Sequence, residues 1–177
     1  MRGDLALDAR LALRAEGLVG LLAAIGGGVA AMAAYLPWYE VTASVAALGR
    51  TESGPAATLA GWQAHPWGWV VPTAAGVAVV VGLSWAIDRP VPRADDVLLA
   101  AGVALSLAVA AAGLWFPPVS RFDVAGSRLR DMTELVDRLP SDVDMSFVVH
   151  PGAGLWASLG AALVVILAGV TVRSMAR

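Results

Sequence analysis

Four charge-free apolar stretches dominate the pattern of hydrophobic and polar positions along the chain. They cover roughly Gly17–Leu36, Trp67–Ile87, Val97–Phe116 and Gly152–Val172. At about 20 residues, each is long enough to cross a hydrocarbon core of ~30 Å as an α-helix. The pattern therefore predicts a bundle of four transmembrane helices.

Charged residues mark the ends of these stretches. Asp95 and Asp96 precede the third stretch, where carboxylates suit the unpaired N–H groups and the positive dipole end of a helix N-terminus. Ala31-Met32-Ala33 resembles a small-residue cleavage site, so a cleaved signal peptide is the alternative for the first stretch. The apolar run exceeds the ~7–15 residues of a typical signal-peptide core, which favours a retained helix.

Arginine density predicts the orientation, because cytoplasmic segments next to a membrane are enriched in basic residues. With the N-terminus inside, short inner segments carry Arg2, Arg10, Arg14, Arg89, Arg93, Arg173 and Arg177, and two much longer outer loops carry Arg50, Arg121, Arg128, Arg130 and Arg138. We therefore expect a multi-pass protein of the inner (plasma) membrane with cytoplasmic segments at residues 1–16 and 173–177. Residues 17–172 form the single four-span domain.

Tryptophan placement agrees with this orientation. Indole rings prefer the membrane–water interface, and only Trp85 falls at the inner end. The others, with Tyr35 beside them, predict a lopsided aromatic belt at the outer end: Trp38, Trp62, Trp67, Trp69, Trp115 and Trp156.

The two outer loops, residues 37–66 and 117–151, contain alternating apolar and polar positions, which is typical of half-buried strands. In "WYEVTASVAAL", Tyr39, Val41, Ala43 and Val45 fall on one face. A turn at Gly49–Pro55 and a run at Ala56–Ala60 predict a hairpin.

Near the end of the second loop, "DVDMSFVVH" alternates again. Val143, Met145, Phe147 and Val149 fall on one face of that segment. Three strands with an apolar face can be stable where a lone hairpin is marginal, so we expect one small antiparallel sheet over the outer membrane face. We call this sheet the β-platform.

Between these strands, "GSRLRDMTELVDRLP" predicts a surface helix over Ser127–Leu139, with Ser127 as N-cap and Pro140 as stop. Leu129, Met132 and Val136 lie on its apolar stripe. This stripe packs on the sheet or the bilayer, or it docks a partner. In the docking interpretation, Trp62 joins these three residues as the candidate partner-binding set.

The only two histidines, His65 and His150, each precede a proline at the start of an apolar stretch. Proline fits the first turn of a helix and pushes the preceding residue out of the α region, so both positions have a structural explanation. The alternative is a metal site with Glu40, Glu52, Asp142 or Asp144. The sequence has no close ligand spacing that supports it.

Small residues recur four apart in every predicted span, which lets helices approach closely. The four stripes are Ala23/Gly27/Ala31, Ala74/Ala78/Gly82, Ala100/Ala104/Ala108 and Ala153/Ala157/Ala161. They predict tight packing within the chain, with dimer contacts as the alternative.

Composition excludes several classes of function. Hydrophobic residues make up 58% of the 177 residues, and the net charge of −2 offers no basic face for nucleic acid. No cysteine is present, which excludes disulfides and thiol chemistry. The predicted spans contain no Asp, Glu, Arg or His, which disfavours a coupled transporter. No catalytic or cofactor-binding motif is found, so we expect neither enzymatic activity nor a cofactor.

Three short motifs carry a resemblance: "YLPWYEV", "ATLAGW" and "PGAGLWASLGAAL". With them the chain resembles uncharacterised four-span actinobacterial membrane proteins, a group that includes the tryptophan-associated transmembrane protein family. The resemblance implies an envelope location and no biochemical role. The layout is also similar to that of claudins, whose two loop cysteines are missing here, so no barrier-forming role is implied.

Together these observations predict a mainly α membrane protein, a four-helix transmembrane bundle with a small extracytoplasmic antiparallel β-sheet and one surface helix. The leading hypothesis is a non-enzymatic protein that contacts the lipid bilayer and uses its β-platform to bind or scaffold another envelope protein. A homo-oligomer is the other possible assembly. The alternative function is a transport accessory that binds a small molecule, a lipid or a metal.

Overall fold

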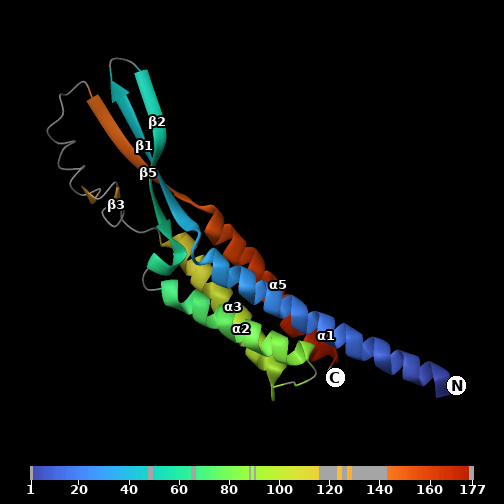
Figure 1. Cartoon of the computed structure of the whole chain (residues 1–177). Coiled ribbons are helices and arrows are strands. Elements are labelled where there is room, and N and C mark those ends of the chain that lie inside the picture. Colours follow the sequence, from blue (N-terminus) through green and yellow to red (C-terminus); the bar gives the residue numbers. More distant parts are fainter. Residues whose placement is uncertain are drawn as a thin grey trace.

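The computed structural model shows a helical bundle that carries a three-stranded sheet at one end (Figure 1). It describes residues 2–47, 50–64, 67–87, 89, 91–115, 123–124, 127–128 and 143–175, with the backbone alone at 2–16, 47, 67, 123–124, 127–128 and 143.

Four long helices form the bundle: α1 (Arg2–Ala33), α2 (Val70–Ala86), α3 (Ala94–Leu114) and α5 (Ala153–Met175). Helix α1 packs against α2 and α5, and α3 packs against the same two helices, so the four form a ring. Helix α1 continues without a break through the boundary predicted at Gly17. The acidic first turn predicted for the third helix is confirmed at Asp95 and Asp96.

Two of these helices, α3 and α5, are long and apolar enough to cross a membrane. The apolar part of α1, Gly17–Ala33, and helix α2 are shorter apolar helices. The structure therefore places apolar helices at all four predicted positions, and two of these helices are long enough to span a membrane.

Glycines bring the helices together in two pairs. A Cβ atom at Gly27 of α1 would lie 2.7 Å from the Ala75 carbonyl oxygen of α2, and one at Gly82 would lie 2.6 Å from the Ala24 nitrogen. On the other side of the bundle, a Cβ at Gly102 of α3 would lie 2.6 Å from the Ile166 side chain of α5. The backbones of α1 and α2, and of α3 and α5, are therefore in direct contact.

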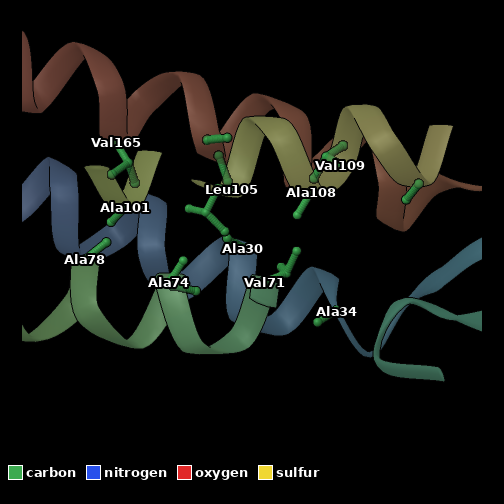
Figure 2. Packing of buried hydrophobic residues seen from close by; sticks show 14 of the residues in the cluster. Ala30, Ala34, Val71, Ala74, Ala78, Ala101, Leu105, Ala108, Val109 and Val165 are labelled. Atoms are coloured by element: carbon green, nitrogen blue, oxygen red, sulfur yellow. The ribbon is translucent and has the colours of Figure 1, made fainter. Parts of the chain in front are cut away.

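The predicted small-residue stripes are correct on α1 and α2, where Ala23 and Gly27 are buried, as are Ala74, Ala78 and Gly82. On α3 and α5 they are shifted, because Ala100 and Ala153 are exposed. Helical periodicity alone could not choose between adjacent small residues in segments that are apolar on every side. Figure 2 shows the observed packing, with Ala101 and Leu105 of α3 facing the α2 alanines.

The sheet has the strand order β2-β1-β5, formed by β1 (Pro37–Ala47), β2 (Arg50–Ala60) and β5 (Val143–Pro151). All pairs are antiparallel. Val41 lies opposite both Val149 of β5 and Ala57 of β2. The predicted alternation along β5 is confirmed, because Met145, Phe147 and Val149 are half-buried while the residues between them are exposed.

The hairpin differs from its prediction. Strand β2 begins at Arg50, so the predicted turn at Gly49–Pro55 is wrong over residues 50–55, and Gly49 lies outside the described residues. Gly54 and Pro55 lie within the strand, where the register shifts between Val41 and Thr42 of β1. The turn-forming residues are tolerated because β2 is an edge strand, in which a proline costs no hydrogen bond on the open side.

Two further short strands, β3 (Asp123–Val124) and β4 (Ser127–Arg128), pair with each other. The start predicted for the surface helix is therefore wrong, because Ser127 and Arg128 belong to a strand. The rest of that predicted helix lies outside the described residues. Leu129, Met132 and Val136 thus remain predictions.

Candidate functional site

The β-platform is joined to the bundle around one side chain, the indole of Trp38. Trp38 follows the first residue of β1 and is fully buried. Its Nε1–H donates a hydrogen bond to the Ala33 carbonyl oxygen at the end of α1, at 3.0 Å. The sequence placed Trp38 in the exposed aromatic belt, and the structure corrects this, because the indole is enclosed by protein.

Two glycines leave the room that this indole occupies. A Cβ atom at Gly61, in the 3-10 helix η1 (Gly61–Gln63), would overlap the Trp38 ring. A Cβ at Gly154, in the first turn of α5, would lie 2.8 Å from Trp38 Cδ1. Trp38, Gly61 and Gly154 each belong to one of the motifs "YLPWYEV", "ATLAGW" and "PGAGLWASLGAAL", so those three motifs meet at one place. We call this place the Trp38 socket.

The neighbouring Tyr39 attaches the sheet to a second helix. Its hydroxyl donates a hydrogen bond to the Ala112 carbonyl oxygen near the end of α3, at 2.7 Å. The last carbonyl groups of a helix lack partners within it, so Tyr39 supplies one. Burial raises the pKa of Tyr39 to about 12, because the phenolate would lose its hydration. The phenol therefore stays protonated, and able to donate, throughout the neutral range.

The connections between the helices and the strands of the β-platform are short. Strand β1 begins four residues after α1 ends, and β5 is separated from α5 by Gly152 alone. The Gly152 N–H donates to the Trp38 carbonyl oxygen at 2.7 Å, and the Trp62 N–H donates to the Ala34 carbonyl oxygen at 2.8 Å. Two strands are thus direct extensions of two helices, and the β-platform has little freedom to tilt.

The two edges of the sheet differ. Strand β2 contains a glycine, a proline and a register shift, features that protect an edge from pairing with another chain. Strand β5 pairs with β1 in unbroken register from Val143 to Pro151. Val148 is 48% exposed on β5, and no strand among the described residues covers the far edge of β5.

The residues of the proposed metal site are only partly brought together. Glu40 lies directly opposite His150 across β1 and β5, and both side chains are exposed. Asp144 lies opposite Ala46 and Glu52 opposite Val45, toward the far end of the sheet. His65 lies outside the described residues, and no group of three ligating side chains occurs in the part of the chain that the structure covers. The metal alternative stays a prediction.

Aromatic side chains surround the end of the bundle that carries the sheet. Tyr35 follows α1, Trp69 precedes α2 at the end of η2 (Trp67–Trp69), Trp115 caps α3, and Trp156 lies in the first turn of α5. All four are more than half exposed, and Trp62 of η1 is 44% exposed. Of the tryptophans predicted for the belt, Trp62, Trp69, Trp115 and Trp156 are therefore exposed at this end, whereas Trp38 is buried and the side chain of Trp67 lies outside the described residues.

The opposite end of the bundle carries charge. Arg89 and Arg93 lie exposed in the connection between α2 and α3. Arg173 Nη1 of α5 lies 3.6 Å from Asp96 Oδ1 of α3, and both side chains are about half exposed. Such a pair adds little stability, but it fixes these charges at one level of the bundle. We call this region the charged end.

A groove runs between α2 and α3 on the outside of the bundle. It has a volume of about 570 Å³ and is lined by apolar side chains, including Val70 and Val77 of α2 and Val97, Ala100 and Ala104 of α3. Thr73 is its one hydroxyl residue, and that hydroxyl donates to the Trp69 carbonyl oxygen at 2.7 Å. This groove was not predicted from the sequence, although the exposed Ala100 and the half-buried Ala104 belong to one of the predicted small-residue stripes.

No protein-family model matches the chain. A search of curated proteins also finds no significant match.

Proposed function

We propose that this chain is a non-enzymatic, four-span protein of the plasma membrane that binds another envelope protein through its β-platform. Both ends of the chain lie in the cytoplasm in this proposal, and the β-platform lies outside. The resemblance to four-span actinobacterial membrane proteins is part of the same proposal.

The spacing between the aromatic belt and the charged end supports four spans. At ~1.5 Å per residue, the α3 path from Asp96 to Trp115 measures about 28 Å, and the α5 path from Trp156 to Arg173 about 26 Å. These lengths are close to the ~30 Å of a hydrocarbon core.

The two shorter helices fit the same layer. Helix α2 is preceded directly by η2, and the Ile87 N–H continues its hydrogen bonding to the Leu83 carbonyl oxygen at 3.1 Å. On α1, the path from Gly17 to Tyr35 measures about 27 Å at ~1.5 Å per residue. Exposed aliphatic side chains occur on all four helices between the two levels, for example Leu22, Val80, Leu107 and Leu167.

Labelling of single cysteines tests the orientation, because the natural chain has no cysteine. Ser146→Cys on β5 and Ser174→Cys near the end of α5 both place the thiol at exposed positions. We expect a membrane-impermeant maleimide to label Ser146→Cys in intact cells and Ser174→Cys only after permeabilisation. Equal labelling of both variants in intact cells refutes the topology.

The single observation that carries the binding proposal is the edge of β5. A regular strand whose far edge pairs with no other described strand, on a firmly attached sheet, offers backbone N–H and C=O groups to an added strand, and its exposed side chains give specificity. The partner in this proposal is an extended segment of another envelope protein. An apolar residue in that segment would pack beside the exposed Val148.

Photo-crosslinking tests this proposal with a matched control. A benzoyl-phenylalanine residue at Val148 on β5 is compared with one at Ser53 on β2, which is also exposed. We expect a discrete protein adduct from Val148, with one partner per chain as identified by mass, and none from Ser53. Adducts of equal yield from both edges, or none from β5, refute strand addition. An adduct of twice the mass of the chain identifies a homo-oligomer instead.

Lipid binding, the second candidate function, is favoured by the groove between α2 and α3. Its walls are apolar, and it faces the side of the bundle that the hydrocarbon layer would surround.

A further inference from the structure

The groove exists because glycine contacts are unevenly distributed around the bundle. Gly27 and Gly82 bring α1 and α2 together, while Gly102 and Gly169 bring α3 and α5 together. Among the described glycines, none makes such a contact between α2 and α3. This pair of helices therefore stays further apart, and the small side chain of Ala100 leaves the space unfilled.

The inner end of the groove is next to a cationic side chain. Arg93 precedes α3, and the Val97 N–H donates to the Arg93 carbonyl oxygen at 3.0 Å, so Arg93 lies one turn below the first groove residue of α3. Arg93 adopts the left-handed conformation, with φ of 59°, and its side chain is exposed. Arg89 is exposed in the same connection between the helices.

The nearby carboxylates do not face the groove. Asp95 is two residues from Val97, which places it on nearly the opposite side of α3. Asp96 is paired with Arg173 of α5. Within the described residues, neither Arg89 nor Arg93 forms an ion pair. The groove thus has an apolar wall, with Arg93 one helical turn beyond its inner end and Trp69 in its lining at the other end.

We propose that this groove binds one phospholipid of the inner leaflet, an inference that rests on the proposed membrane location. The lipid phosphate lies against the guanidinium groups of Arg93 and Arg89, and one acyl chain follows the groove past Val97 and Ala100. From Arg93 to Ala104 the α3 wall measures about 16 Å, and one leaflet is ~15 Å deep. Arginine suits this role because its planar donor groups can bind a phosphate through two hydrogen bonds.

Native mass spectrometry tests the site with protein released from nanodiscs of equal parts phosphatidylglycerol and phosphatidylethanolamine. We expect the natural chain to retain one phospholipid. Ala100→Phe fills the groove from an exposed position and abolishes retention. Gly160→Phe is the control, because Gly160 is exposed on α5 with no atom within 4 Å of its added Cβ. It should retain lipid as the natural chain does.

Arg93→Gln tests the headgroup contact without adding bulk to the bundle. Loss of a hydrogen bond to a charged group lowers retention about tenfold. If Ala100→Phe does not fold, as judged by its melting transition, Arg93→Gln decides alone. Retention that is unchanged in Arg93→Gln, or equal in Ala100→Phe and Gly160→Phe, overturns the proposal, as does a natural chain that retains no lipid.

Cysteine labelling separates the two possible failures. If Ser146→Cys and Ser174→Cys label as a spanning topology requires while no phospholipid is retained, the lipid site is wrong and the membrane location stands. If the labelling fails, the basis for both proposals is lost.

Discussion

The Trp38 socket predicts a specific coupling between two residues that are distant in the sequence. In Gly61→Ala, the added methyl group would overlap the Trp38 ring. The ring cannot move away, because it is fully buried and its Nε1–H is hydrogen-bonded to the Ala33 carbonyl oxygen. Overpacking of this kind costs ~1–3 kcal/mol. For a chain of this size, each 1 kcal/mol lowers the melting temperature by ~2–4 °C.

A double-mutant cycle isolates the contact. Trp38→Phe removes part of the ring and the hydrogen bond to Ala33, so this change alone is also destabilising. In Gly61→Ala/Trp38→Phe the methyl group enters the space that the indole has left. The free energy of unfolding lost in the double variant is therefore smaller than the sum of the losses in the two single variants, by ~0.5–3 kcal/mol.

The assay is the melting temperature of the purified protein in one detergent, with Gly160→Ala as the control. An added Cβ at Gly160 meets open space, and alanine favours a helix over glycine, so this variant should not lose stability. The reasoning is refuted if Gly61→Ala has the same melting temperature as the natural chain. It is refuted equally if the stability lost in the double variant is the sum of the losses in the two single variants.

Three further results are expected. Tyr39→Phe lowers the free energy of unfolding by ~0.5–1.5 kcal/mol at neutral pH, because the hydrogen bond from Tyr39 to α3 is removed. The pKa of Tyr39 is raised from 10 to about 12, so the natural chain also loses stability as the pH rises from 10 to 12; alkaline unfolding curves that are equally steep in both proteins contradict this. Gly27→Leu disrupts the contact between α1 and α2 and lowers the melting temperature, whereas Gly28→Leu, with nothing within 4 Å of its added Cβ, does not. Phe147→Asp puts a charge on the half-buried face of β5 and makes the sheet sensitive to protease, whereas Ser146→Asp on the exposed face leaves it resistant; resistance in both variants means that this face is not packed.

Periodicity was sufficient to predict the elements whose two faces differ. The strand alternation around Val41 and Phe147 placed both strands correctly, because a one-residue shift would expose the apolar side chains. The apolar helices were located just as well. Their buried faces were not, since α3 and α5 offer small residues on more than one side, and only contact with a neighbouring helix selects Ala101 over Ala100.

The role of Trp38 could not be derived from local pattern. A tryptophan beside an apolar stretch is typical of the membrane interface. Trp115 and Trp156 are indeed exposed, at the end of the bundle that carries the sheet. What distinguishes Trp38 is space provided by Gly61 and Gly154, from two distant segments. The signal in the sequence was the glycine in each of the other two motifs. That these glycines make room for Trp38 could be recognised only from the fold, which brings Trp38, Gly61 and Gly154 together.

The strand order β2-β1-β5 has a consequence for how the protein is made. Strand β1 pairs first with β2, which follows it closely, but its second partner, β5, comes after the α2–α3 helical hairpin has been synthesised. One edge of β1 therefore has no β5 to pair with until residues 143–151 have been synthesised. Pairing with β5 is then completed together with the placement of α5, which follows β5 directly. The last described helix, α5, is thus continuous with the strand that completes the sheet, so the placement of α5 in the bundle and the pairing of the second edge of β1 become a single step of folding.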